Sequence, residues 1–206
     1  MAKVIHQRTE GNPLFMVNVV EYLVTQGVLA PVEGRWELKG RPEDLVVGVP
    51  QSLRQMIEKQ IEGLGAEEQQ MLEVASVAGM EFSAAAVAAG NEKRVEEIEG
   101  RCEALARREQ FLRAQGTAAW PDGTMAARYG FLHALYQEVL YERVPVSRRQ
   151  RLHRRIGERA EAAYGEQARE IAAELAVHFE QGREYRKASQ YLQQAGENAR
   201  AIALKL

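Results

Sequence analysis

The middle of the chain contains three short helical patterns, followed by two stretches of strand-like composition. The helices are predicted at residues 67–78, directly after Ser83, and at residues 91–108, with Asn91 as the expected cap of the third. The strands are predicted at residues 110–114 and 127–131, on either side of a stretch rich in glycine, proline and aspartate. Three helices followed by a β-hairpin wing are the element order of a winged helix.

The N-terminal region predicts a helix that Asn12 caps, Pro13 begins and Gly27 ends. Its residues 14–23 are almost wholly apolar, so we expect this helix to be buried on most of its sides. The chain starts only a few residues earlier, at Met1, with nothing that resembles the first strand of a domain. We therefore expect the natural protein to extend before residue 1.

A small hairpin and a connecting helix follow this first helix. The hairpin strands are predicted at residues 28–30 and 35–38, around a turn-rich stretch. The connecting helix has one apolar stripe and ends at Gly65; the stripe consists of Leu53, Ile57, Ile61 and Leu64.

The C-terminal third predicts helices throughout. One runs from about His133 to Arg143, the next is capped by Ser147, and the last two are separated at Gly182. The last two helices resemble one tetratricopeptide-like unit, with small residues where helices would approach closely. Because repeat arrays generally need about three such units to bury their faces, we expect the natural protein to continue beyond Leu206.

Composition is that of a globular protein, with 46% hydrophobic and 27% charged residues. The net charge of −2 offers no general attraction for nucleic acid. The first ten residues lack the apolar stretch of a signal peptide, and no window approaches the roughly 20 apolar residues of a membrane span. A cytoplasmic location without membrane contact is therefore expected.

The residues for phosphoryl transfer are missing from this sequence. A P-loop needs a glycine-rich turn that ends in Gly-Lys, and no lysine here follows a glycine. The two aspartates, Asp44 and Asp122, lie in turn-like segments and not at the end of an apolar strand, where a magnesium ligand would be expected. The chain is therefore not expected to be an enzyme on its own or to hold a nucleotide cofactor.

Metal and nucleophile chemistry are also not expected. The four histidines are His6, His133, His153 and His178, and their spacing is not that of a metal site. The single cysteine, Cys102, lies on the apolar stripe of its predicted helix, which indicates a buried core thiol.

Six arginines follow Ser147 on one predicted helix, and arginines on one helix can bind phosphate. They are Arg148, Arg149, Arg151, Arg154, Arg155 and Arg159. Glu158 and Glu161 are interspersed and the apolar stripe is intact, so a solvated face is the simpler interpretation. Specific DNA binding is not expected.

Several segments, taken in order, resemble the STAND class of signal-transduction ATPases, especially bacterial regulators. These segments are Thr-Glu-Gly-Asn-Pro-Leu-Phe at 9–15, Val-Pro-Gln-Ser-Leu at 49–53, Leu-Glu-Val-Ala-Ser-Val-Ala-Gly at 72–79, and Phe-Leu-His-Ala-Leu-Tyr-Gln-Glu-Val-Leu-Tyr at 131–141. The resemblance covers about residues 5–200. It implies that the part before residue 1 is a nucleotide-binding domain that binds ATP or ADP.

The resemblance also implies three nucleotide-contacting residues, which would act only in the full-length parent. Pro13, with Gly11 beside it, corresponds to the proline that packs near adenine, and His133 corresponds to a histidine that reaches the ADP phosphate. The sequence departs from relatives at Leu132, Ala134 and Gln137. Read from the residues alone, Pro13 is simply a good helix start and His133 a cap for the helix after it.

The expected fold is mainly α and has three parts. Residues 1–65 would form a helical lid and connecting helix, residues 66–145 the winged-helix domain, and residues 146–206 a helical linker with the first tetratricopeptide-like repeat. The expected function is regulatory, coupling nucleotide state to domain rearrangement, with the missing nucleotide-binding domain, downstream repeat or effector domains, and a protein partner as the interaction partners. Two alternatives remain open: a DNA-binding winged helix and a tetratricopeptide-type interaction scaffold.

Overall fold

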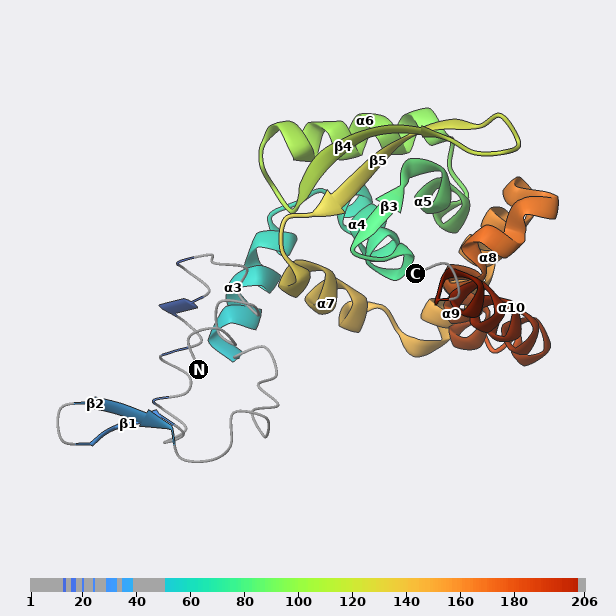
Figure 1. Ribbon diagram of the computed structural model, residues 1–206. Coiled ribbons are helices and arrows are strands. Elements are labelled where there is room, and N and C mark those ends of the chain that lie inside the picture. Colours follow the sequence, from blue (N-terminus) through green and yellow to red (C-terminus); the bar gives the residue numbers. More distant parts are fainter. Residues whose placement is uncertain are drawn as a thin grey trace.

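The computed structural model (Figure 1) describes residues 51–203, strand residues 29–32 and 35–38, and five single helical residues. These single residues are Pro13, Met16, Val17, Val20 and Val24. In this part of the chain the fold is mainly helical, with a small three-stranded antiparallel sheet. None of the helices described is both long and apolar enough to cross a lipid bilayer.

The helices are α3 (Gln51–Glu62), α4 (Ala66–Ala78), α5 (Ala84–Asn91), α6 (Val95–Arg107), α7 (Ala134–Arg143), α8 (Val146–Tyr164), α9 (Ala172–Gln181) and α10 (Tyr185–Ala203). A 3-10 helix, η2 (Gly165–Ile171), joins α8 to α9. The strands are β1 (Leu29–Val32), β2 (Arg35–Leu38), β3 (Glu81–Ser83), β4 (Leu112–Ala119) and β5 (Met125–Phe131).

The N-terminal predictions are confirmed in part. Strands β1 and β2 form the expected antiparallel hairpin. The five single described residues are helical, as predicted for this segment. Burial of that helix on most sides is wrong for Val17, Val20 and Val24, which are exposed, because apolar composition alone does not specify what covers a side chain. Gly11 lies outside the described residues.

The sheet has the strand order β3-β5-β4 and is antiparallel throughout. Strand β3 was not predicted, because its three residues are too short for a period to be recognised. Strand β4 is longer than predicted and continues through Gly116, which has φ 93° beside a register shift between Ala114 and Thr117. A glycine that would end a regular strand is here part of a bulge within it.

Two predicted helix caps are wrong. Asn91 is the last residue of α5, and its side-chain amide donates to the Val87 carbonyl oxygen at 3.2 Å, so it closes the helix before α6. Helix α6 begins instead after Arg94, which makes no side-chain cap. Ser147 lies inside the first turn of α8, because the preceding Pro145 already supplies the extended residue at the helix start.

The Ser83 prediction is confirmed in atomic detail. Its hydroxyl oxygen accepts a hydrogen bond from the Ala85 backbone N–H at 3.2 Å, which satisfies a donor at the start of α5. The same residue ends β3, so one side chain fixes the turn from the edge strand of the sheet into a helix of its core.

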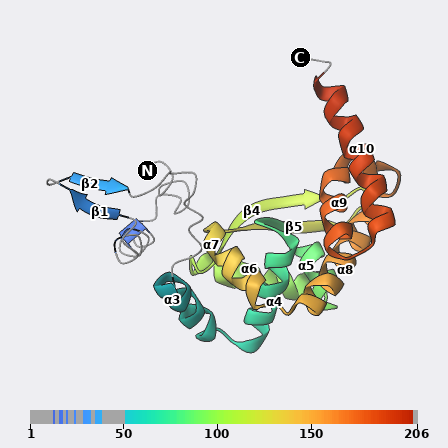
Figure 2. The same ribbon diagram turned by 90° about the horizontal axis from the view of Figure 1, so that it is seen from below.

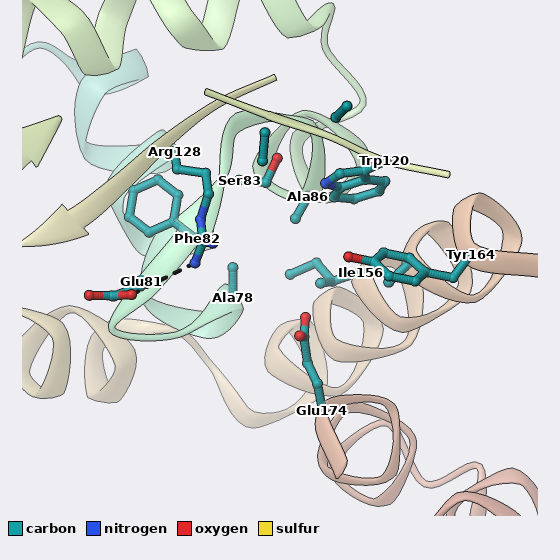
Figure 3. A pocket seen from close by; sticks show the side chains of 13 residues that line it. Ala78, Glu81, Phe82, Ser83, Ala86, Trp120, Arg128, Ile156, Tyr164 and Glu174 are labelled. Atoms are coloured by element: carbon teal, nitrogen blue, oxygen red, sulfur yellow. Dashed lines mark ion pairs between the residues drawn. The ribbon is translucent and has the colours of Figure 1, made fainter. Parts of the chain in front are cut away.

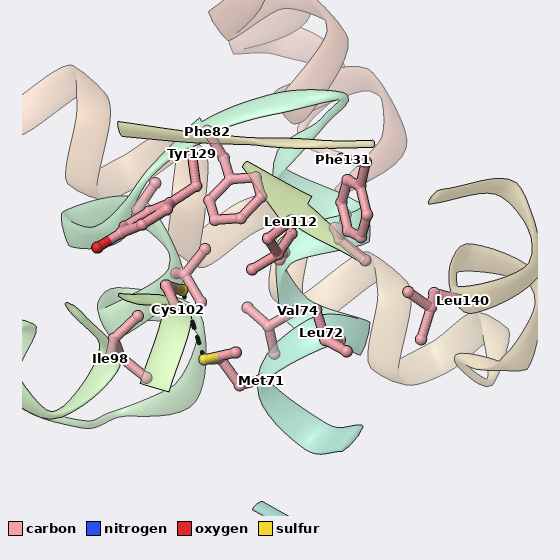
Figure 4. Packing of buried hydrophobic residues seen from close by; sticks show 14 of the residues in the cluster. Met71, Leu72, Val74, Phe82, Ile98, Cys102, Leu112, Tyr129, Phe131 and Leu140 are labelled. Atoms are coloured by element: carbon pink, nitrogen blue, oxygen red, sulfur yellow. Dashed lines mark hydrogen bonds between the residues drawn. The ribbon is translucent and has the colours of Figure 1, made fainter. Parts of the chain in front are cut away.

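The main hydrophobic core extends from α3 to α8. In Figure 4 Phe82, Leu112 and Phe131 of the sheet lie over the α4 residues Leu72 and Val74, all of them buried. The core crosses the sequence positions at which the three parts were predicted to divide, since residues of both α3 and α8 belong to it. The division itself stays a prediction.

A second, smaller core lies around the end of α8. It consists of Ala160, Ala168, Leu175, Phe179 and Ala188. Helices α9 and α10 form an antiparallel hairpin there, and Figure 2 shows α10 projecting away from the sheet. Helix α8 therefore contributes side chains to both cores.

The contact between α4, α5 and α8 depends on a residue without a side chain. A methyl group at Gly90 would lie 2.4 Å from Val74 Cγ1 and 3.6 Å from Leu152 Cδ2. We predict that Gly90→Ala lowers the free energy of unfolding by about 1–3 kcal/mol, because the buried, β-branched Val74 has little freedom to move aside. Urea unfolding measures this change.

Gly100→Ala is the matched control. Gly100 lies within α6, and a methyl group there meets no atom within 4 Å. This control should stabilise the protein by about 0.5–1 kcal/mol through helix propensity. Equal effects of the two substitutions would contradict the close packing at Gly90.

Candidate functional site

A pocket lies where the sheet, α5, α8 and α9 meet (Figure 3). Its volume is about 330 Å³. The lining comes from seven elements, α4, β3, α5, β4, β5, α8 and α9, and from the β4–β5 turn. Polar side chains in it are those of Glu81, Ser83, Arg128, Tyr164 and Glu174. Small side chains leave the space open, namely Ala78, Ala86, Ala118, Ala119 and Ala160.

The turn between β4 and β5 positions Trp120 in the pocket wall. The backbone N–H of Trp120 donates to the Thr124 carbonyl oxygen at 2.8 Å. Gly123, with φ 86°, allows the chain to reverse there. The Asp122 carboxylate accepts from the Thr124 backbone N–H at 2.9 Å, and these bonds to Thr124 are the largest cause of its lowered pKa. The Pro-Asp-Gly-Thr sequence thus builds a closed, internally bonded turn.

Arg159 of α8 fastens this turn to the helix. Its guanidinium donates to Asp122 Oδ2 at 2.9 Å and to Thr124 Oγ1 at 2.8 Å. The same group lies 4.8 Å from the centre of the Trp120 ring, in a cation–π contact. The indole is therefore held between α8 and the pocket.

Of the charged groups in the pocket, Arg128 and Glu81 form an ion pair, whereas none is found for Glu174 among the described residues. The Arg128 guanidinium lies 3.7 Å from Glu81 Oε2, and Glu81 also accepts a hydrogen bond from Gln115 at 2.7 Å. Glu174 is exposed, and Figure 3 shows its carboxyl group turned toward the pocket. Removal from water raises the pKa of Glu174, and the positive charge of Arg128 opposes this effect.

Tyr164 closes the pocket on the side of α8. Its ring lies 6.1 Å from that of Trp120, with an angle of 54° between the ring planes. Burial raises the pKa of the Tyr164 hydroxyl, which is therefore neutral across the physiological range. The pocket thus combines the rings of Trp120 and Tyr164, a floor of alanines and the carboxyl group of Glu174, for which the described residues form no ion pair.

Two buried histidines join α8 to α9 near this pocket. His153 Nδ1 and His178 Nδ1 are 3.0 Å apart, and the Tyr141 hydroxyl of α7 is 3.1 Å from His153 Nε2. One proton fits between the two Nδ1 atoms, so one ring donates and the other accepts. Burial lowers the pKa of His153 to about 3, with further lowering by His178 and Arg149, and burial lowers that of His178 to about 4.

Glycines bring the same two helices into close contact. A methyl group at Gly157 of α8 would lie 3.1 Å from His178 Cβ and 3.3 Å from the Phe179 ring. At Gly182, after α9, it would meet the His178 carbonyl oxygen at 3.0 Å and the Arg154 backbone nitrogen at 3.1 Å. The α8–α9 joint therefore has little room for relative movement of its two helices.

Two of the three residues predicted to contact nucleotide, Pro13 and His133, do not line this pocket. His133 precedes α7, is half-buried, and its ring lies 5.8 Å from that of Tyr136. Its backbone carbonyl accepts from the Tyr136 N–H at 3.1 Å, but its side chain makes no cap bond to α7, so the alternative interpretation of His133 as a side-chain cap is wrong. Pro13 is helical and exposed, and Gly11 lies outside the described residues.

The α8 arginines are not one solvated face. Four of the six form ion pairs: Arg148 with Glu73, Arg154 with Glu158 and Glu184, Arg155 with Glu92, and Arg159 with Asp122. Arg149 lies 4.4 Å from the centre of the Tyr141 ring. The row that the sequence places on one helix is thus divided among contacts to α4, α7, the residue after α5, the α9–α10 turn and the β4–β5 turn.

Cys102 is fully buried, as predicted, and its Sγ lies 3.5 Å from Met71 Sδ. Burial raises the pKa of its thiol to about 12, so it is not a nucleophile near neutral pH. Across residues 51–203 and the other described positions, no group of three or more histidine, cysteine, aspartate or glutamate side chains is arranged to hold a metal ion.

The pocket residues were missed by sequence reasoning. Trp120 could have been noted, because it directly precedes the Pro-Asp-Gly turn. Arg128 and Glu174 carry no such signal, since each is one charged residue in an ordinary strand or helix. Only the fold brings them together.

Comparisons of the chain with protein-family models, with curated proteins and with solved structures found no match.

The histidine pair predicts how stability depends on pH. Both histidines stay neutral in the folded protein far below their ordinary pKa of 6.5, whereas the unfolded chain takes up protons near that value. Their contribution is therefore complete above pH 6.5 and lost as pH falls toward 4, by about 1.4 kcal/mol per pH unit for each histidine. Chemical unfolding at a series of pH values measures the slope.

His178→Gln serves as the comparison. It removes one of the two groups, so its slope between these pH values should be smaller than that of the unchanged protein by about 1.4 kcal/mol per pH unit. Carboxylates contribute to acid unfolding in both proteins, so the difference isolates the histidines. Identical slopes would show that His178 is not held neutral.

Proposed function

We propose that this chain is a regulatory and interaction portion of a nucleotide-switched signalling or transcription-regulating ATPase of the STAND class. Its role is to couple the nucleotide state of a preceding nucleotide-binding domain to a rearrangement of domains. The support from sequence is the order of four segments, at residues 9–15, 49–53, 72–79 and 131–141, each resembling that family. The binding of ATP or ADP belongs to the parent protein and not to this chain alone.

In this proposal α4, α5, α6 and the β4–β5 hairpin form a winged helix, and α9 with α10 forms one tetratricopeptide-like unit. The helix-helix-helix-hairpin order and the pairing of β4 with β5 support the first assignment. The close antiparallel pairing of α9 with α10, with Ala188 packed against Leu175 and Phe179, supports the second.

The observation that carries the proposal is that α8 packs into both hydrophobic cores. One continuous helix contributes Leu152 and Ile156 to the main core and Ala160 to the core of the C-terminal hairpin. The α8–α9 joint is close-packed through Gly157, so a displacement of the C-terminal hairpin would move α8 with it. A two-state switch needs such an element, because only contacts that differ between states shift an equilibrium.

Within this switch, His133 in front of α7 would contact the ADP phosphate, and Gly11 with Pro13 would lie near the adenine. His133 is half-buried at a helix start and its ring is supported by Tyr136, which suits a side chain held at a domain surface. These contacts would exist only in the full-length parent.

A DNA-binding winged helix is the second candidate, favoured by the element order alone. Its recognition helix would be α6. Arg101 of that helix is already paired with Glu67 of α4, and Arg108, directly after the helix, is paired with Glu68 of α4. DNA phosphates would have to compete with these bonds, so the charges weigh against this function.

An interaction scaffold is the third candidate, and the exposed side chains of Val177, Tyr185 and Leu192 on α9 and α10 favour it. One helical hairpin offers little groove to a partner by itself. The α9–α10 hairpin is therefore better explained as the part of the proposed switch that connects it to downstream domains.

We predict that the chain does not bind duplex DNA specifically, which a gel-shift assay at low salt measures. The reason is its net charge of −2 together with the ion pairs that Arg101 of α6 and Arg108 at its end already make. Tight binding that weakens steeply as salt rises would contradict this prediction. Loss of that binding in Arg101→Ala/Arg108→Ala, but not in the Arg200→Ala control on exposed α10, would assign it to α6.

The decisive test of the proposal uses the full-length parent. Its open reading frame should contain a Gly-Lys-Ser or Gly-Lys-Thr P-loop before residue 1, and its absence would overturn the proposal. In that protein His133→Ala should raise the dissociation constant for ADP by about tenfold to a hundredfold, because a hydrogen bond to a charged phosphate is lost. Calorimetric titration with ADP measures the change.

Gln137→Ala is the control on the same helix. Its side-chain amide donates to the Ser76 carbonyl oxygen at 2.7 Å, so it holds α7 on α4 without a proposed nucleotide contact. The control should lower the melting temperature and leave ADP affinity unchanged. If His133→Ala behaves in the same way, His133 is structural and its nucleotide role is wrong.

A further inference from the structure

The pocket of Figure 3 contains a carboxyl group for which the described residues supply no ion-pair partner. Glu174 of α9 turns its carboxyl group inward, and no described cation lies within 4.0 Å of it. Its neighbour Arg128 is directed at Glu81, at 3.7 Å. Glu174 is an exposed residue that lines the pocket, so its carboxylate is a negative charge that a bound cation can reach and pair with.

The walls beside Glu174 favour a particular kind of cation. Trp120 and Tyr164 present aromatic rings to the pocket, and aromatic faces attract organic ammonium ions. The Arg159 guanidinium, which does not line the pocket, already makes a cation–π contact with the Trp120 ring at 4.8 Å. This indole therefore attracts a cation in the folded protein. A bare metal ion would need several oxygen or nitrogen ligands, and no such group is found among the residues described.

The floor accommodates an apolar body. It is formed by alanines with Ile156 and Phe82, so a hydrocarbon group lying there would lose contact with water without leaving a polar atom unsatisfied. A volume of about 330 Å³ is in the range of small-molecule pockets. The site therefore combines the features of amine recognition: a counter-charge, aromatic walls and an apolar floor.

We propose that this pocket binds a small organic ammonium ion, with the Glu174 carboxylate as counter-charge and its hydrocarbon part between Trp120, Tyr164 and the alanine floor. The proposal goes beyond the function proposed above and does not depend on it. A bound ligand would contact the hairpin turn, α8 and α9 together. Binding would therefore strengthen the attachment of α9 to the sheet-bearing part of the protein.

The opposing charge of Arg128 does not exclude this ligand. The positive charge of Arg128 acts on the pKa of both Tyr164 and Glu174. Its guanidinium is paired with the Glu81 carboxylate, which offsets that charge. An anionic ligand would have to approach both Glu81 and Glu174, and a neutral one would leave Glu174 uncompensated. An ammonium ion is the ligand charge that the described groups favour.

Trp120 provides the measurement. The chain has two tryptophans, so Trp36→Phe leaves Trp120 as the only indole emitter. In this protein, phenethylammonium should change the Trp120 emission saturably. The neutral 2-phenylethanol and the anionic 3-phenylpropionate, which have similar hydrocarbon parts, should bind at least about tenfold more weakly, because they cannot pair with the carboxylate.

Substitution of the carboxyl group is the second part of the experiment. In the same background Glu174→Gln should weaken phenethylammonium binding by about tenfold or more, and Glu174→Asp should retain part of the affinity. Glu166→Gln is the matched control on η2, since Glu166 is exposed and does not line the pocket, and it should bind as tightly as the unchanged protein. Melting curves establish that each variant is folded.

Three results would overturn the proposal. One is equal binding of the alcohol and the ammonium ion, which would indicate apolar partition alone. Another is preferential binding of the carboxylate, which would assign the site to Arg128. The third is unchanged affinity in folded Glu174→Gln. Because none of these measurements involves nucleotide, their outcome is independent of the proposed ATPase relationship.

Discussion

The structure depends most on the way α8 packs against the rest of the chain. Its side chains Leu152 and Ile156 are buried, and each contributes about 1.5–3 kcal/mol by removal from water. Its ion pairs are partly exposed, and such pairs typically contribute about 0–1 kcal/mol each. Apolar burial therefore supplies most of the attachment energy. The arginines determine which neighbour each turn of the helix contacts.

This division of roles explains why Arg159 matters to the pocket more than to stability. It makes hydrogen bonds to Asp122 and Thr124 and stacks on Trp120, three groups of one turn. The hairpin turn is thereby placed at a fixed position on α8. The same helix carries Tyr164, so both aromatic walls of the pocket are set by one element, whereas the acid opposite them comes from α9.

Periodicity predicted most helices because buried stripes such as Leu53, Ile57 and Ile61 recur at helical spacing. It failed where one residue type serves two purposes. Asn91 can begin a helix or end one, and only the left-handed Glu92 after it settles the matter. The pocket was beyond sequence reasoning, because Arg128 and Glu174 meet only through strand pairing and the α8–α9 packing, neither of which leaves a local pattern.

Helix α9 connects the two unusual features of the C-terminal region. Glu174 and His178 are one turn apart on it, so they lie on the same side of the helix. His178 is fixed to α8 through His153, with Gly157 beside it, while Glu174 faces the open pocket. A ligand that pairs with Glu174 would thus act on a helix already anchored at its next turn. Binding energy would then tighten one end of α9 against the sheet instead of moving the whole helix, because the neutral histidine pair resists displacement at any pH well above 4.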